Sequence, residues 1–212
     1  MVATQIKFVV VGHHTRSSAA VRLANSIGAH LLIDDESRGA NWNHHRAIEW
    51  AAQQDCRVVI LEDDAQPVEG FLLLVSEWLV RFPDDLVSFY LGTGRPPQYQ
   101  PVIAQRLIEA DRHRWDCITL PRLIHGVCYS PPQHALAGIL TRWNEDKPAD
   151  FAVGDAYGAA VIYPCYSLAD HADSAAVEVH PDGEVRRERR RAWRLAQSAS
   201  NANGSHSHLH YS

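Results

Sequence analysis

In the first half of the chain, short apolar runs rich in β-branched residues alternate with longer segments whose apolar residues recur every three or four positions. The short runs predict buried strands, and the longer segments predict helices with one apolar face. The predicted strands cover residues 6–11, 31–33, 58–61 and 86–91. The helices are predicted to begin near Ser17, beyond Gly39 and at Pro67, a residue type favoured in the first turn of a helix.

This order of elements predicts an α/β fold with a mainly parallel, Rossmann-related central sheet and helices on both faces. In such open sheets, ligands bind outside the carboxyl ends of the strands. We therefore expect the polar residues that follow the predicted strands to meet at one edge of the sheet. They are Gly12, Asp34, Glu62 to Asp64 and Gly92.

After Arg95 the alternation weakens, and Pro96 and Pro97 open a loop. We expect helices at residues 102–110, after Pro148 and at 184–196, and short strands at 116–120 and 127–129. We expect this half of the chain to determine which substrate the protein accepts.

Residues 1–197 should form one domain. Residues 198–212 are rich in Ser, Asn and His and are expected to be a disordered tail, because they have almost nothing to bury. We assign the alternating histidines of this segment to the tail rather than to a metal site; they are His206, His208 and His210.

The composition, with 212 residues of which 46 % are hydrophobic, is ordinary for a globular protein. No run reaches the roughly 18 apolar residues of a membrane span, and Met1 to Lys7 lack the features of a signal peptide, so we expect a cytoplasmic protein. The four cysteines show no metal-ligand spacing and are expected to be reduced thiols. They are Cys56, Cys117, Cys128 and Cys165.

The net charge of -5 gives no global reason to expect nucleic-acid binding, but six arginines lie in one short segment, from Arg186 to Arg194. This segment is interpreted either as a solvated helix end or as a phosphate-binding patch for DNA, RNA or anionic lipid. No helix-turn-helix or zinc-finger motif accompanies it.

The stretch VVILEDDAQP, residues 58–67, runs from four apolar residues directly into three carboxylates. Adjacent buried carboxylates need a cation or hydrogen-bond donors, because burial otherwise disfavours their charged form. Mg²⁺ and Mn²⁺ prefer such oxygen ligands and are commonly bound together with substrate phosphates. The alternative is a solvated turn before a helix that begins at Pro67.

This stretch resembles the strand and acidic motif of glycosyltransferases with the GT-A fold, particularly the lipopolysaccharide-type glycosyltransferase family 25. The resemblance implies a D-x-D-like element in which a divalent metal bridges the diphosphate of a nucleotide-sugar donor. It implies Asp64 as the best metal ligand, with Glu62 or Asp63 contributing directly or through water; of these two, we assign Glu62 to the metal and Asp63 to the donor. The segment YPCYSLADHADS, residues 163–174, resembles a P-S-L-x-x-H element of several GT-A families, which implies His171 as a further ligand of the metal or the diphosphate.

Two other segments are similar to donor-binding parts of these enzymes. VVVGHHTR, residues 9–16, resembles the first strand and loop, and LLIDD, residues 31–35, resembles the second strand, whose terminal acid often meets the base or ribose. GANWNHHRAIEWA, residues 39–51, resembles the segment that lies against the donor. The implied donor contacts are Gly12, His13, Thr15, Arg16, Asp34, Asp35, Asn43, His44 and Arg46.

The second half is expected to bind the acceptor. LIHGVCYSPP, residues 123–132, resembles an H-G-x-x-x-Y stretch near the sugar and the acceptor, which implies His125 and Tyr129 as contacts, and Arg95 follows the fourth predicted strand. An inverting transfer needs a general base for the acceptor hydroxyl. Asp150 or Asp155 is the candidate; Asp150 is equally suited to cap a helix, and a retaining mechanism would need neither.

The resemblance predicts a metal-dependent glycosyltransferase that uses Mn²⁺ or Mg²⁺ and a nucleotide sugar. We expect the nucleotide sugar to be UDP-linked. Residues 1–95 would form its nucleotide-binding half and residues 96–197 its acceptor half. Compact enzymes of this kind resemble those carried by bacteriophages, so a modified base in DNA is one candidate acceptor and a surface saccharide or lipid-linked sugar is another. A nucleotidyltransferase and a non-catalytic nucleotide-sugar-binding module remain the alternatives.

Overall fold

The computed structural model describes residues 5–172 and 189–197. The first three predicted apolar runs form neighbouring parallel strands in it: β1 (Ile6–His13), β2 (His30–Asp34) and β3 (Arg57–Glu62). β1 lies between the other two, and its residues Val9 and Val10 are fully buried. The carboxyl ends of the three strands therefore meet at one edge, as the sequence predicts.

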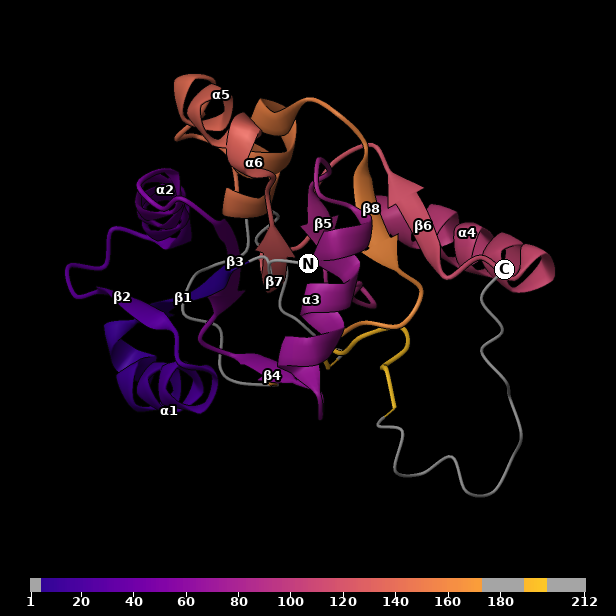
Figure 1. The fold of residues 1–212 in the computed structure, drawn as a ribbon, viewed down its shortest axis with the longest axis horizontal. Helices are drawn as coiled ribbons and strands as arrows, with labels where there is room; N and C mark the ends of the chain where they lie inside the picture. The colour runs from indigo at the N-terminus through magenta and orange to yellow at the C-terminus, as the bar shows by residue number, and fades with distance from the viewer. Residues whose placement is uncertain (1–4, 173–188, 198–212) are drawn as a thin grey trace.

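Four shorter strands complete a sheet of seven strands within the described residues, in the order β2-β1-β3-β7-β5-β8-β6. They are β5 (Val87–Ser88), β6 (Cys117–Leu120), β7 (Cys128–Ser130) and β8 (Val161–Pro164). β7 and β6 run antiparallel to their neighbours, and the other five strands share one direction. Figure 1 shows this order from β2 to β6 across the molecule. The sheet is mostly parallel, which confirms the coarse fold prediction.

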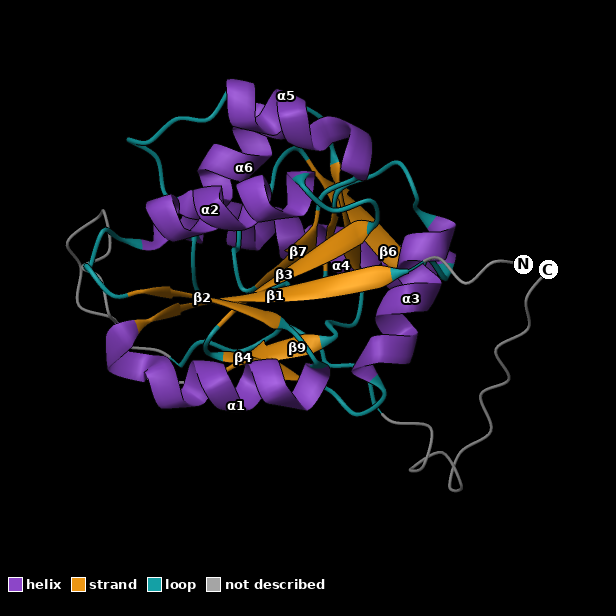
Figure 2. Cartoon of the chain, turned by 60° about the vertical axis from the view of Figure 1, so that its left-hand side comes forward, coloured by secondary structure: helices purple, strands orange, loops and turns teal. Residues whose placement is uncertain are grey.

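Helices cover both faces of the sheet (Figure 2). On one face, α2 (Ala40–Ala52), α4 (Gln100–His113), α5 (Leu136–Thr141) and α6 (Ala149–Tyr157) contribute to one buried cluster. On the other face, α1 (Ser17–Ile27) and α3 (Phe71–Arg81) contribute to a second. Three short 3-10 turns complete the helical elements of the described residues: η1 (His14–Arg16), η2 (Pro97–Tyr99) and η3 (Gln133–Ala135).

A small antiparallel pair, β4 (Ala65–Pro67) and β9 (Ala169–His171), lies beside the main sheet. Its register places Ala65 opposite His171. Because β4 directly follows the acidic residues at the end of β3, this pairing carries His171 to them.

The prediction that a helix begins at Pro67 was wrong. Pro67 pairs with Ala169 in β4, and α3 begins at Phe71, after Gly70 with a φ of 76°. A tertiary partner for the extended backbone outweighs the preference of proline for a first helical turn. The predicted strand at 86–91 is confirmed only over Val87–Ser88.

The prediction of a helix at residues 184–196 was wrong for its described part, which begins at residue 189. This C-terminal segment (residues 189–197) is not helical: Ala192 bridges Gly92, and the Trp193 N–H donates to the carbonyl of Leu91. Backbone partners in distant segments therefore replace the hydrogen bonds of a helix. The predicted tail, residues 198–212, lies outside the described residues.

Among the described residues, no helix is long and apolar enough to cross a membrane.

Candidate functional site

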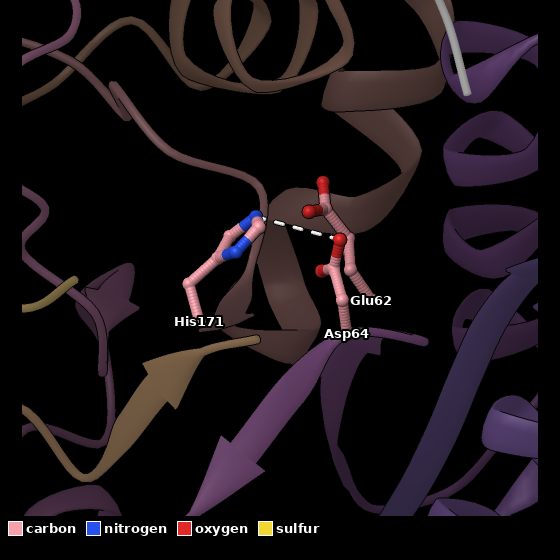
Figure 3. A group of neighbouring side chains, drawn as sticks. All are labelled: Glu62, Asp64 and His171. Atoms are coloured by element: carbon pink, nitrogen blue, oxygen red, sulfur yellow. Dashed lines mark ion pairs between the residues drawn. The ribbon is translucent and has the colours of Figure 1, made fainter. Parts of the chain in front are cut away.

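The acidic residues lie where β3 ends and the chain turns into β4. Asp63 and Asp64 are buried, and the Glu62 side chain is partly exposed. Glu62, Asp64 and His171 each offer one ligand atom, and these atoms lie within 4.8 Å of one another. Figure 3 shows the two carboxylates and the imidazole pointing toward one another. The structure thus brings together the three residues expected to bind a metal.

The histidine of this group is held in one tautomer. His171 Nδ1 lies 2.6 Å from the carbonyl oxygen of Ala172, which can only accept, so Nδ1 carries the proton. The lone pair is on Nε2, which lies 3.4 Å from Asp64 Oδ2. A hydrogen bond that orients a histidine in this way is typical of metal-binding imidazoles.

Arg16, at the end of η1, pairs with two of the carboxylates. Its Nη1 lies 2.5 Å from Asp64 Oδ2, and its Nη2 lies 2.8 Å from Asp63 Oδ1, the latter without the geometry of a hydrogen bond. Asp63 also accepts a 2.9 Å hydrogen bond from the His13 N–H. Gly12 allows the end of β1 to pack closely against α1, because a Cβ on Gly12 would lie 2.8 Å from that of Ala20.

Burial dominates the electrostatics of the two aspartates. It raises the pKa of Asp63 to about 6 and raises that of Asp64, and the neighbouring Glu62 adds to both shifts. Burial also acts to raise the pKa of Glu62, but the adjacent imidazole of His44 outweighs it, so that the pKa is lowered. Asp64 Oδ1 is buried without a hydrogen-bond partner in the described part of the chain. Asp63 Oδ1 is likewise without one, so the carboxylates keep acceptor atoms that the described residues do not use in hydrogen bonds.

His44 of α2 forms the other wall of the site. Its Nδ1 lies 2.9 Å from the hydroxyl of Tyr129, and its Nε2 lies 3.3 Å from Glu62 Oε1. Gly126 leaves room for this contact, because a Cβ there would lie 2.5 Å from Glu62 Oε1. Tyr129, expected near the acceptor, is fully buried and reaches the site only through His44.

The structure separates the two candidate bases. Asp150 lies in the first turn of α6, and its pKa is raised to about 6, mainly by burial. The charge of Glu62 raises this pKa further, whereas His44 acts to lower it. Asp155 instead pairs with Arg122 at 3.0 Å and with Lys147 at 2.6 Å. Asp150 therefore lies near the acidic site, whereas Asp155 joins α6 to its surroundings.

Several predicted donor contacts have partners within the protein. Asp34 accepts hydrogen bonds from the backbone N–H groups of Arg38 and Gly39, which outweigh burial and lower its pKa. Asn43 donates to the carbonyls of Gly12 and Leu32. Their side chains fix the turn after β2 and the ends of the strands.

The remaining predicted donor contacts lie around the same strand ends. Arg46 donates to the carbonyl of Ile33 and stacks on Trp42. Asp35 is exposed, and so is Thr15, whose hydroxyl lies 2.8 Å from His13 Nδ1. The loop after β1 is therefore the part of this set that presents polar groups to solvent beside the acidic site.

His125 contacts the loop that contains Arg95, and its ring packs edge-on against Tyr90. Its Nε2 lies 2.8 Å from the carbonyl oxygen of Arg95, so Nε2 donates and Nδ1 keeps a lone pair that is buried without a partner in the described chain. Burial lowers the pKa of His125 to about 4, so the ring is neutral at pH 7. The contact of Arg95 with His125 is made by its backbone.

The arginine segment does not behave as its composition suggests. Arg190 Nη1 lies 3.0 Å from Nε2 of His171, and Arg194 forms two 2.7 Å hydrogen bonds with Asp111. Arg189 and Arg191 are exposed, and Arg186 and Arg187 lie outside the described residues. Sequence reasoning missed Arg190 as a site residue because the run offered no signal to distinguish one arginine from the others.

The residues present fit a hard divalent cation. Two carboxylates and an imidazole Nε2 are a donor set for Mn²⁺ in particular, and the unpartnered Oδ1 of Asp64 shows an unused acceptor. Ligands at roughly 2.1 Å from an ion lie at most about 4.2 Å apart. A shift of a few tenths of an ångström would therefore bring the three ligand atoms to an ion.

The comparisons with known proteins bear on the fold alone. No protein-family model matches the chain, and no curated protein matches it. Among solved structures, the chain is similar to A197 from STIV, with a TM-score of 0.54 and 11 % sequence identity over 96 % of this chain and 100 % of the other. This likeness supports a mixed α/β architecture built around the mostly parallel sheet.

Proposed function

We propose that the protein is a metal-dependent glycosyltransferase that moves a sugar from a nucleotide-sugar donor, UDP-linked in our hypothesis, to an acceptor hydroxyl. The observation that carries this proposal is the convergence of Glu62, Asp64 and His171 at the carboxyl end of β3, where an α/β sheet binds its ligands. The resemblance of residues 58–67 and 163–174 to GT-A enzymes supports the same function.

In this proposal, Glu62, Asp64 and His171 hold Mn²⁺ or Mg²⁺, which would offset the negative charge that develops on the departing diphosphate. The loop after β1, with His13 and Thr15, would contact the nucleotide. Asp150 would accept the proton of the acceptor hydroxyl, since a carboxyl with a pKa of about 6 is largely ionised at pH 7 and still basic enough to take a proton.

The acceptor stays open between a saccharide hydroxyl and a modified base in DNA. Of the arginines that a DNA acceptor was expected to use, Arg190 contacts His171 and Arg194 pairs with Asp111, whereas Arg189 and Arg191 are exposed. Both a saccharide and phage-type hydroxymethylated DNA are therefore substrates in the assay.

The test is a donor screen that measures released nucleoside diphosphate with Mn²⁺, with Mg²⁺ and with a chelator. We expect release from one nucleotide sugar, loss of activity with the chelator, and a decrease of at least about 100-fold for Asp64→Asn. Asp111→Asn is the matched control, because Asp111 pairs with Arg194 on the surface.

Two outcomes would contradict the proposal. Pyrophosphate release from a nucleoside triphosphate in the same assay would indicate a nucleotidyltransferase. Metal-dependent binding of a nucleotide sugar in calorimetry, without turnover on saccharide, DNA or water, would indicate a non-catalytic binding module.

A further inference from the structure

Two of the three candidate ligand atoms are each in contact with an arginine. Asp64 Oδ2 lies 2.5 Å from Nη1 of Arg16, and His171 Nε2 lies 3.0 Å from Nη1 of Arg190. Arg16 comes from η1 near the start of the chain, and Arg190 comes from the C-terminal segment. A divalent cation on His171 would need the one lone pair of Nε2 that faces Arg190, so the two cannot occupy Nε2 together. A cation on Asp64 could use Oδ1, which has no hydrogen-bond partner among the described residues, but it would lie beside the guanidinium group that holds Oδ2. Binding of a cation would therefore displace Arg190 and repel Arg16.

These contacts are not surface ion pairs. The side chains of Asp64 and His171 are 3 % and 2 % exposed, and that of Arg16 is 24 % exposed. Since a buried carboxylate without a counter-charge is strongly disfavoured, Arg16 supplies positive charge that the folded protein needs at this point. The two arginines thus supply positive charge at the site, although Asp64 Oδ1 has no hydrogen-bond partner among the described residues.

We propose that Arg16 and Arg190 supply the positive charge that faces Asp64 and His171 until a divalent cation binds. The two guanidinium groups then leave these residues and pair with the diphosphate of the donor. This inference rests on the proposed function, and it adds two diphosphate-binding residues and a coupling between metal and nucleotide. The cation replaces the guanidinium groups on Asp64 and His171, and the diphosphate replaces Asp64 and His171 as the partner of the arginines.

Displacement of the two arginines is favourable only when the cation and the diphosphate bind together. A cation that binds alone must displace charge-assisted contacts and leave two guanidinium groups without those partners. A diphosphate offers them new ones, because arginine binds phosphate oxygens through two parallel hydrogen bonds. Metal and nucleotide should therefore increase each other's affinity by the same factor, as linkage requires.

The test is equilibrium dialysis at set free Mn²⁺ concentrations, with bound manganese determined by elemental analysis, in the absence and presence of UDP. Inorganic pyrophosphate is used in parallel, because it carries a diphosphate without a base. For the wild-type chain, we expect UDP or pyrophosphate to raise the affinity for Mn²⁺ by about tenfold or more.

Variants at the two arginines should reduce this coupling. In Arg16→Gln, we expect tighter Mn²⁺ binding without nucleotide and an effect of UDP that is about threefold or more smaller than in the wild type, since only the direct interaction of metal and diphosphate remains. Arg190→Gln should change in the same direction. Arg194→Gln is the matched control, because Arg194 lies in the same segment and pairs with Asp111, so its coupling should equal that of the wild type. Arg16→Lys retains a positive charge and serves if Arg16→Gln fails to fold, as judged by circular dichroism; its coupling should be intermediate.

The outcomes separate this inference from the proposed function. Equal Mn²⁺ affinity of the wild-type chain with and without diphosphate would overturn the exchange and leave the metal site intact. The same holds if Arg16→Gln tightens Mn²⁺ binding by one factor under both conditions, because Arg16 would then be only a nearby charge. Absence of Mn²⁺ binding by every variant under every condition would overturn the exchange and the proposed metal site together.

Discussion

At the scale of single residues, the surroundings of two aspartates determine which of them is suited to act as a general base. Asp150 and Asp155 lie on the same short helix, α6. Asp155 forms ion pairs with Arg122 and Lys147, whereas burial raises the pKa of Asp150 to about 6. A raised carboxyl pKa means that the charged, basic form is lost already in mildly acidic solution. The two aspartates should therefore differ in their effect on activity.

The pH dependence of transfer tests this difference. If Asp150 is the base, the rate at saturating Mn²⁺ and donor should be constant above pH 7 and should fall as the pH decreases through about 6, because protonated Asp150 cannot accept a proton. Asp150→Asn should lower the rate by about 100-fold or more and remove this limb. Asp155→Asn is the control and should keep both the rate and the limb; a rate of Asp150→Asn equal to that of Asp155→Asn would exclude Asp150 as the base.

Gly126 tests the geometry of the ligand set. In Gly126→Ala, the added methyl group would lie 2.5 Å from Glu62 Oε1, at the end of a side chain that can rotate away, so we expect a stable fold and Mn²⁺ affinity reduced by about tenfold. Thermal unfolding and equilibrium dialysis measure the two effects.

Gly154→Ala gives the contrasting case. Its methyl group would lie 2.6 Å from the backbone nitrogen of Leu123, which cannot move alone, so the melting temperature should fall while the folded fraction binds Mn²⁺ normally. Unchanged Mn²⁺ affinity in Gly126→Ala would show that Glu62 is not a ligand.

At the scale of elements, buried polar groups join strands that the hydrophobic pattern treats as separate. Arg57, at the start of β3, bonds to both the hydroxyl and the carbonyl of Ser130 in β7, and to the carbonyls of Pro83 and Asp85 before β5. Burial lowers the pKa of Arg57 to about 10, so the side chain remains charged at pH 7. One guanidinium group therefore fixes the junction of the two halves of the sheet.

Replacement of Arg57 by methionine should be costly for stability. It leaves buried carbonyls without donors, which we expect to lower the free energy of unfolding by on the order of 3 kcal/mol. For a chain of this length, that corresponds to a melting temperature roughly 6–12 °C lower. Arg81→Met is the control, since Arg81 forms an exposed ion pair with Asp116 worth less than about 1 kcal/mol. Equal shifts in the two variants would show that Arg57 contributes no more than a surface charge.

At the scale of the whole molecule, the candidate site is assembled from distant parts of the chain. The end of β3 provides the carboxylates, β9 provides His171, and the loop after β1 and the C-terminal segment provide the arginines. The pairing of β4 with β9 carries His171 to the site, and the bridge between Gly92 and Ala192 anchors the segment that contains Arg190. Arg190 was absent from the residues expected at the site because no local pattern encodes these two pairings.

The sequence by itself determined the order of strands and helices in the first half, the position of three carboxylates at a strand end, and His171 as their companion. These follow from periodicity, from the cost of adjacent buried charges and from short motifs, all of which are local. Only the tertiary structure decided that Pro67 lies in a strand, that residues 189–197 are not helical, and that Asp34 and Asn43 support the backbone. These outcomes depend on pairings between segments far apart in the chain, where the burial and hydrogen bonds of a partner outweigh local preference.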